Sequence, residues 1–512
     1  MNPKSAAIRR RASRTIAVAT VFLGTLGITH SASAGTPTEA DEMAWLDDVS
    51  PAVTIDQSTG CMAGATDAVA YRNDRIVLRT SVANPAVTAT VNTTLNGMYG
   101  GNLNYVGPIE RITFPTPPGG PAIVDVVSVT LMPRPSGAPH DILGLARHLR
   151  NDSGKIASPD YAFSYYGPYV HYFPYGYPTK ISALTPPRTN LTSAGLKIGT
   201  GVKIHVDDTG LFAVDPVNLP TTTQLTADDN DLVNRVNNGP LMIDFPAGGH
   251  GEGIDGVLTT VAPGSSIVDV RINDRAGLAT DVSAARAIAG SLRSLTIPNY
   301  PNLLVQSFGT AVCDKNPAVP GPVLQPVGME AVVEAVDRFD PFEPGGMLIV
   351  AAAGNEATTR PHYPAAFSSV LSVGALDGTK DSDLSPWSSP SKTAPVADFS
   401  NRGSTVDAYA LGVSLPTATV SGVRFETGGD VFEGKGAVSG TSFAAPKMAA
   451  YIAERMSTSG NTARGARDYL LAHGVAPLPQ CGTQTVETGK AVVLSSLTAS
   501  ITDPPTGNPI TC

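Results

Sequence analysis

Residues 202–210 are Val-Lys-Ile-His-Val-Asp-Asp-Thr-Gly. The apolar run 202–206 predicts a buried strand, and the acids and glycine that follow it predict a turn at the strand's carboxyl end. Similar apolar runs predict further buried strands, and the stretches 282–292 and 327–339 have the apolar spacing of helices. These further strands are expected at 241–245, 267–272, 303–308 and 347–353. Strands that alternate with helices predict an α/β fold, with a mostly parallel sheet flanked by helices.

The residues before this α/β region form a separate pattern. Runs at 75–79 and 124–131 predict strands, a polar stretch with glycines lies between them, and Asp141 begins a predicted helix with an apolar face. We therefore expect a small α+β domain. The expected divisions are a leader at 1–34, an irregular segment at 35–70, the α+β domain at 71–165, a linker at 166–198, the α/β domain at 199–475 and a C-terminal extension at 476–512.

The N-terminus has the pattern of a secretory signal. Four arginines between residues 9 and 14 precede an apolar run at 15–29, which is too short to span a bilayer, and Ala32-Ser33-Ala34 offers a cleavage site. The alternatives are a short membrane anchor and, because of the paired arginines, twin-arginine export. We expect a secreted, extracellular chain, since no later apolar run is long enough to anchor it.

Charge and cysteine content exclude some functions. The 512 residues carry a net charge of −9, which argues against a nucleic-acid partner. The four cysteines, at 61, 313, 481 and 512, form no metal-binding pattern. In an exported chain their even number suggests two disulfides, and the pairing of Cys481 with Cys512 is the most local of the three possible connectivities.

Polar residues follow the predicted strands at positions suited to a site. In parallel sheets, sites lie beyond the carboxyl ends of the strands. Asp208 follows the strand at 202–206, His250 lies between two glycines after 241–245, and Asn355 follows 347–353. Taken alone, each has an ordinary structural explanation, because Asp-Thr-Gly and Gly-Asn turns are common and most histidines bind nothing. Asp207 is expected to be structural or exposed, and His205 is expected to be a surface or core residue without a catalytic role.

Residues 440–446, Gly-Thr-Ser-Phe-Ala-Ala-Pro, supply a candidate nucleophile. Ser442 lies at a glycine turn before a predicted helix, whose N-terminus favours developing negative charge. With this serine the chain has an orienting acid (Asp208), a base (His250), an oxyanion donor (Asn355) and a nucleophile.

These motifs resemble those of the subtilisin-like serine proteases, the subtilases of peptidase family S8. The resemblance covers roughly residues 199 to 470 and includes several secondary matches. The motifs are Asp208-Thr209-Gly210, Gly249-His250-Gly251, Ala352-Ala353-Gly354-Asn355 and Gly440–Pro446, with Tyr363-Pro364-Ala365, Ser372–Ala375 and Phe399-Ser400-Asn401-Arg402-Gly403 in support. The α+β domain resembles, less strongly, a subtilase propeptide.

The resemblance implies a serine endopeptidase made as a zymogen, whose propeptide inhibits it and whose other partners are protein or peptide substrates. Asp208, His250 and Ser442 would be catalytic and Asn355 would bind the oxyanion. The substrate would lie against Ser307, Phe308, Gly309, Ala353 and Gly354. No cofactor is implied. Calcium is common in the family, but no acidic loop identifies a site. We expect self-processing between Phe163 and Ile198.

One departure from the family pattern leaves alternatives open. After His250 the chain reads Gly251-Glu252-Gly253-Ile254-Asp255-Gly256, so a glycine replaces the usual second histidine and two acids are added. Glu252 keeps open an acid-acting, sedolisin-like peptidase, and the altered motif keeps open a peptide-binding pseudo-protease. Insertions are expected at 316–325, 378–395 and 414–434.

Overall fold

A computed structural model describes residues 53–56, 69–153, 156–165, 169–170, 198–209, 222–225, 250–272, 279–312, 323–377, 395–413, 415–424, 430–474 and 490–491. All of them belong to one compact unit, which spans 37–172 and 177–512. The predicted leader, the predicted strand at 241–245 and all four cysteines lie outside these residues. No helix in the described ranges is both long and apolar enough to cross a membrane.

An eight-stranded sheet forms the centre of the α/β region, and all its strand pairs are parallel. This confirms the predicted mostly parallel sheet. Its strands, in spatial order, are β19 (Lys490–Ala491), β16 (Ala408–Leu411), β15 (Leu371–Leu376), β13 (Leu348–Ala352), β11 (Leu303–Gln306), β8 (Lys203–Asp208), β10 (Ser266–Arg271) and β9 (Thr222–Leu225).

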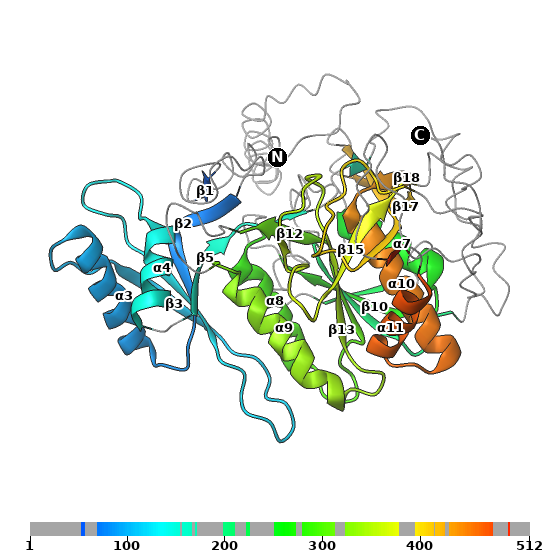
Figure 1. Cartoon of the computed structure of the whole chain (residues 1–512), viewed down its shortest axis with the longest axis horizontal. Helices are drawn as coiled ribbons and strands as arrows, with labels where there is room; N and C mark the ends of the chain where they lie inside the picture. The colour runs from blue at the N-terminus through cyan, green and yellow to red at the C-terminus, as the bar shows by residue number, and fades with distance from the viewer. Residues whose placement is uncertain are drawn as a thin grey trace, which may run out of the picture. The chain divides into compact units, whose positions relative to one another are not determined.

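Helices cover both faces of this sheet, because alternate side chains of its strands point to opposite faces. Leu304 of β11 packs in the cluster that contains α8 (Asp281–Ser294) and α9 (Val327–Phe339). Its neighbour Leu303 packs in the cluster that contains α7 (His250–Val261) and α10 (Thr441–Ser459), beside which lies α11 (Ala463–His473). Figure 1 shows these helices around the sheet.

The N-terminal region is an α+β layer. β2 (Val69–Arg79) is central to an antiparallel sheet with β1 (Val53–Asp56), β4 (Val126–Leu131), β3 (Val106–Ile112) and β5 (Ile156–Tyr161). The predicted helix after Asp141 is α4 (Ile142–Ser153). Sequence reasoning missed α3 (Asn84–Tyr99), which is rich in Thr and Asn and has only Val87, Val91 and Leu95 buried.

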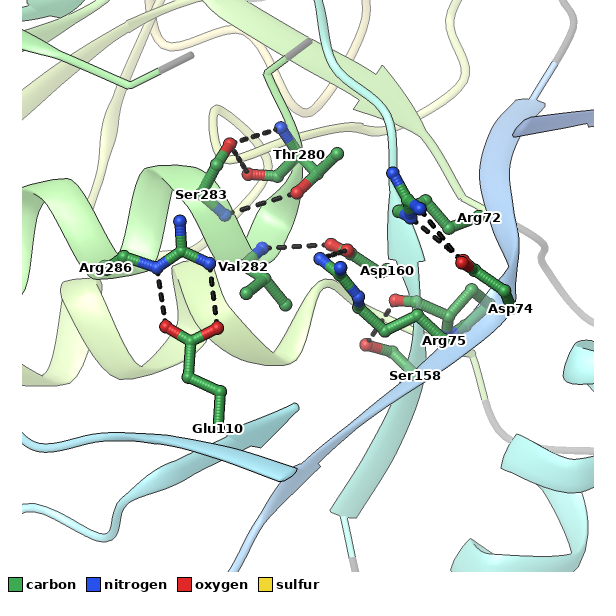
Figure 2. Close-up of polar contacts among 11 residues, drawn as sticks. Arg72, Asp74, Arg75, Glu110, Ser158, Asp160, Thr280, Val282, Ser283 and Arg286 are labelled. Carbon is green, nitrogen blue, oxygen red and sulfur yellow. Dashed lines mark hydrogen bonds and ion pairs between the residues drawn. The ribbon is translucent and has the colours of Figure 1, made fainter. Parts of the chain in front are cut away.

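This layer packs against α8 and α9, with which it shares one hydrophobic cluster. Polar contacts join the two regions (Figure 2). Asp160 of β5 accepts a hydrogen bond of 3.0 Å from the backbone N–H of Val282 in the first turn of α8, and Ser158 accepts one of 3.2 Å from Val327 at the start of α9. Glu110 of β3 binds Arg286 of α8 through both carboxylate oxygens.

Several short strands fall inside segments that were expected to lack regular structure. β1 and the start of β2 lie within 35–70, β7 (Tyr169–Val170) lies within the expected linker and β19 within the expected extension. These segments form strands because they pair with other strands, although their own sequences do not predict a strand. The insertion expected at 414–434 is largely a hairpin of β17 (Leu415–Arg424) and β18 (Asp430–Ser439). The domain boundaries stay predictions.

Candidate active site

Asp208 ends β8 and is fully buried. One of its carboxylate oxygens, Oδ1, accepts a hydrogen bond of 2.8 Å from the backbone N–H of Thr209. The same oxygen lies 2.8 Å from Nδ1 of His250. A carboxylate in this position fixes the orientation of an imidazole ring and stabilises its protonated form.

His250 is the first residue of α7 and is buried. The hydroxyl oxygen of Thr209 accepts a hydrogen bond of 3.1 Å from the backbone N–H of Gly251, so the turn after β8 is fastened to the start of the helix. The ring of His250 lies 5.5 Å from the ring of Phe443, centroid to centroid. Because Phe443 follows Ser442, this contact brings the histidine next to the serine's turn.

Ser442 is the second residue of α10 and is buried in the full chain. Its hydroxyl donates a hydrogen bond of 2.9 Å to the backbone oxygen of Ser307, and the Ser307 hydroxyl donates one of 2.8 Å to the backbone oxygen of Ser442. Gly440 has a φ of 146° at the turn before the helix, a conformation that favours glycine. Ser307 therefore holds the candidate nucleophile in place through two hydrogen bonds.

Asn355 lies just past β13 and reaches the same turn. Its side-chain oxygen accepts hydrogen bonds of 2.9 Å from both the backbone N–H and the hydroxyl of Thr441. The Thr441 hydroxyl oxygen accepts one of 3.2 Å from the backbone N–H of Gly354. With its oxygen held at the start of α10, Asn355 is tied to the residue that precedes Ser442.

Asn401 organises the loop that carries Asn355. Its side-chain oxygen accepts from the backbone N–H groups of Glu356 (3.1 Å) and Thr358 (3.0 Å), and its amide donates to the Ala353 carbonyl (2.9 Å) and the Glu356 carboxylate (2.7 Å). Its backbone N–H donates to the Gly354 carbonyl over 2.9 Å. Sequence reasoning noted the Phe399–Gly403 motif but assigned no role to this asparagine.

The two residues of β8 that were expected to have no catalytic role, Asp207 and His205, lie on its opposite face and are buried. Asp207 accepts a hydrogen bond of 3.0 Å from the amide of Gln306 and is fully buried, which raises its pKa to about 7. His205 is also buried, and burial lowers its pKa to about 4. Since side chains alternate along a strand, neither points toward the face on which Asp208 meets His250.

Of the two acids after His250, the structure describes the side chain of only one. Asp255 is fully buried within α7, whereas the Glu252 side chain lies outside the described residues. In the described part of the chain, no group of three or more His, Cys, Asp or Glu side chains is arranged to hold a metal ion.

Phe308 and Gly309, two of the residues expected to bind substrate, belong to a strand whose two edges pair with other strands of the same chain. β12 (Phe308–Ala311) pairs antiparallel with β6 (Ser164–Tyr165) on one side and with β14 (His362–Tyr363) on the other. Ala353 and Gly354 directly follow β13, and Gly354 has a φ of 108°. An extended peptide thus already lies on the edge of β12.

Comparison with known proteins gives consistent matches. A model described as "Subtilase family" matches residues 199–473. Thermitase from Thermoactinomyces vulgaris is 26% identical over 288 residues, which cover 52% of this chain and 79% of thermitase. Proteinase T from Parengyodontium album is 26% identical over 306 residues, covering 59% of this chain and 86% of that protein.

A solved structure also matches. It is that of fervidolysin from Fervidobacterium pennivorans, described as a keratinolytic enzyme related to subtilisin. The match has a TM-score of 0.50 and 17% identity, and it covers 84% of this chain and 62% of fervidolysin. At this identity the likeness supports the fold alone.

Proposed function

The chain belongs to the subtilase family of serine endopeptidases, and from this premise we propose that it hydrolyses peptide bonds through Asp208, His250 and Ser442, with Asn355 as an oxyanion donor. The observation that carries the proposal is the 2.8 Å contact of Asp208 with His250, together with the contact of His250 with Phe443, the residue after Ser442. The acid, the base and the candidate nucleophile thus form one chain of neighbours.

In the proposed mechanism, the Ser442 hydroxyl leaves its hydrogen bond to Ser307 and attacks the carbonyl carbon of a substrate peptide. His250 takes the hydroxyl proton and passes it to the leaving amine, which gives an acyl-enzyme. A water molecule, activated by the same histidine, then hydrolyses the ester. Asp208 keeps the imidazole in the required orientation and balances its charge through Nδ1.

The negative charge that develops on the substrate oxygen needs donors already in position. We assign this role to the Asn355 amide and the backbone N–H of Ser442 at the start of α10. The backbone N–H and the hydroxyl of Thr441 both donate to the Asn355 side-chain oxygen and so fix the direction of its amide nitrogen. The amide therefore needs no reorientation when the charge develops.

Replacement of the nucleophile tests this assignment. Ser442→Ala is expected to lower kcat for a peptide substrate by at least ~10⁴-fold and to abolish labelling by a fluorophosphonate probe. Ser459→Ala, at the exposed end of the same helix, is the matched control and should keep wild-type rates. Unlabelled wild-type Ser442 in a folded chain freed of its N-terminal region would favour a pseudo-protease. Full activity of His250→Ala at acid pH would favour a sedolisin-like mechanism.

We also propose that the enzyme is secreted as a zymogen. The leader-like residues 1–34 motivate export, and a Bacillus subtilis relative, 28% identical over 268 residues, is named "Minor extracellular protease Epr". That match covers 51% of this chain and 32% of the relative. The N-terminal α+β layer, packed on α8 and α9 and continuing into a strand on β12, would block the site until it is removed.

A further inference from the structure

His140 is a buried histidine of the N-terminal layer and lies between the end of β4 and the start of α4. Its Nε2 is 2.8 Å from the backbone oxygen of Met132. Because a carbonyl oxygen only accepts hydrogen bonds, Nε2 carries the proton of the neutral ring. The other ring nitrogen, Nδ1, is buried and has no hydrogen-bond partner among the described residues.

Two tyrosine rings enclose this imidazole. The centre of the Tyr99 ring, at the end of α3, lies 5.8 Å from the centre of the imidazole, and that of Tyr105, just before β3, lies 5.7 Å from it. The Tyr99 hydroxyl accepts a hydrogen bond of 2.8 Å from the backbone N–H of Asp141, which precedes α4. His140 and its two tyrosine neighbours therefore connect α3, β3, β4 and α4.

Charged groups around the imidazole disfavour its protonated form. Burial lowers the pKa of His140 below its ordinary value, and the positive charge of Arg134 lowers it further. The Arg134 guanidinium lies 3.9 Å from the centre of the Tyr99 ring. The backbone hydrogen bond of the imidazole and the Asp74 carboxylate oppose this shift, but Asp74 is already paired with Arg72 at 2.9 Å.

We propose that His140 makes the N-terminal layer sensitive to acid, so that protonation of Nδ1 loosens the layer and frees the active site. The inference rests on the proposed zymogen. A proton on Nδ1 would create a buried N–H without an acceptor and a second positive charge near Arg134, and both are unfavourable. Because Tyr105 belongs to the same hydrophobic cluster as α8 and α9, altered packing around His140 affects the cluster that holds the layer in place.

The direction of the pKa shift sets the pH at which the layer should loosen. A histidine whose pKa is lower in the folded chain than its unfolded value of 6.5 stabilises the fold fully above that pH, and this stability is lost as the pH falls through the folded value. The layer should therefore be held firmly at neutral pH and loosen in acid. Burial raises the pKa values of Asp160 and Asp281, which act in the opposite direction, so variants have to be compared at one pH.

Hydrogen exchange followed by mass spectrometry tests the proposal on the full-length Ser442→Ala chain, which lacks the proposed nucleophile. After correction for intrinsic exchange rates, the protection of residues 84–153 should fall about tenfold from neutral pH to mild acid, and that of α10 should fall less. His140→Phe keeps an aromatic ring that cannot be protonated, so its layer should stay protected in acid. His148→Phe, at an exposed position of α4, is the matched control and should lose protection as the parent chain does. Equal loss of protection in the two variants would overturn the proposal.

A second measurement does not depend on whether His140→Phe folds. Exchange of the imidazole Cε1 hydrogen, followed by mass spectrometry, measures the pKa of single histidines, and that of His140 should lie below 6.5. Arg134→Gln removes the repelling charge and should raise this pKa. A pKa of His140 at or above 6.5 in the parent chain, or no response to Arg134→Gln, would contradict the proposed role of the imidazole.

Activity of the wild-type chain connects the loosening to the release of the enzyme. After incubation in mild acid, hydrolysis of a peptide assayed at neutral pH should appear about tenfold sooner than after incubation at neutral pH, and His140→Phe should remove this difference. Equal release after both incubations would overturn the inference and leave the proposed function standing. Acid loosening of the Ser442→Ala chain without any hydrolysis by wild type would overturn the proposed function and not the acid-sensitive layer.

Discussion

Asn401 fastens the loop of residues 353–358, which carries the candidate oxyanion donor. Within that loop Ala357 has a φ of 54°, a conformation that is uncommon for a residue other than glycine. The Asn401 side chain donates a hydrogen bond to the Ala353 carbonyl and accepts from the N–H groups of Glu356 and Thr358, and these bonds offset the cost of this backbone. Asn401 is therefore a positioning residue for Asn355.

Asn401→Ala is expected to lower kcat about 10- to 100-fold with little change in KM, since a displaced oxyanion donor weakens the transition state more than the bound substrate. Steady-state kinetics on a peptide substrate measure this split. Asn299→Ala removes an exposed asparagine far from the loop in sequence and should keep both constants. An equal fall in activity for both variants, or a change in KM alone, would argue against a positioning role.

Asp207 makes stability depend on pH. Burial raises its pKa to about 7 in the folded chain, above the unfolded value of 3.8, so the folded state binds the extra proton between these values. The stability that Asp207 contributes is fully present below pH ~4 and is lost as the pH rises through ~7. Over this range the free energy of unfolding falls by at most ~1.4 kcal/mol per pH unit. Urea unfolding of Ser442→Ala, which avoids self-digestion, should show this fall. Adding Asp207→Asn should make it shallower, and the remainder is expected from Asp281 and Glu454, whose pKa values burial raises to about 8.

At the scale of elements, the loop after β13 needs a glycine at position 354. A Cβ there would lie 2.2 Å from the Asn401 amide nitrogen and 2.5 Å from the Glu356 carboxylate, and the φ of 108° is itself unfavourable for other residues. Gly354→Ala should therefore abolish measurable activity while circular dichroism stays close to wild type. Gly97→Ala is the control, because no atom lies within 4 Å of its Cβ position. Gly97 lies in the last turn of α3, and its replacement by alanine should keep activity and stabilise the chain by up to ~1 kcal/mol.

The elements differ in how far the sequence predicted them. β8 and β13 were predicted closely because each is a compact apolar run that ends in polar residues. α3 was missed, since Val87, Val91 and Leu95 form its buried side among polar residues that favour turns as readily as helices. The order of the strands in the sheet depends on contacts between distant residues, which a local pattern does not encode.

For the whole molecule, the sequence predicted an N-terminal α+β region before an α/β region, but not how they contact each other. No role was assigned to Asp160 from the sequence. In the structure it is fully buried, pairs with Arg75 over 3.1 Å and accepts from the first turn of α8. Such a role becomes visible only when β5 and α8, distant in sequence, lie side by side (Figure 2).

If the N-terminal layer is removed as proposed, Asp160 should set how firmly that layer stays bound to α8 before it dissociates. Asp160→Ala removes the acceptor for the Val282 N–H and leaves Arg75 without this partner, a loss of about 2 kcal/mol or roughly 30-fold in affinity. Peptide hydrolysis should then appear sooner after purification. Asp74→Ala, which removes a partly exposed acid paired with Arg72 within the N-terminal layer, is the matched control. If both variants release activity at the wild-type rate, the contact at the start of α8 does not hold the layer in place.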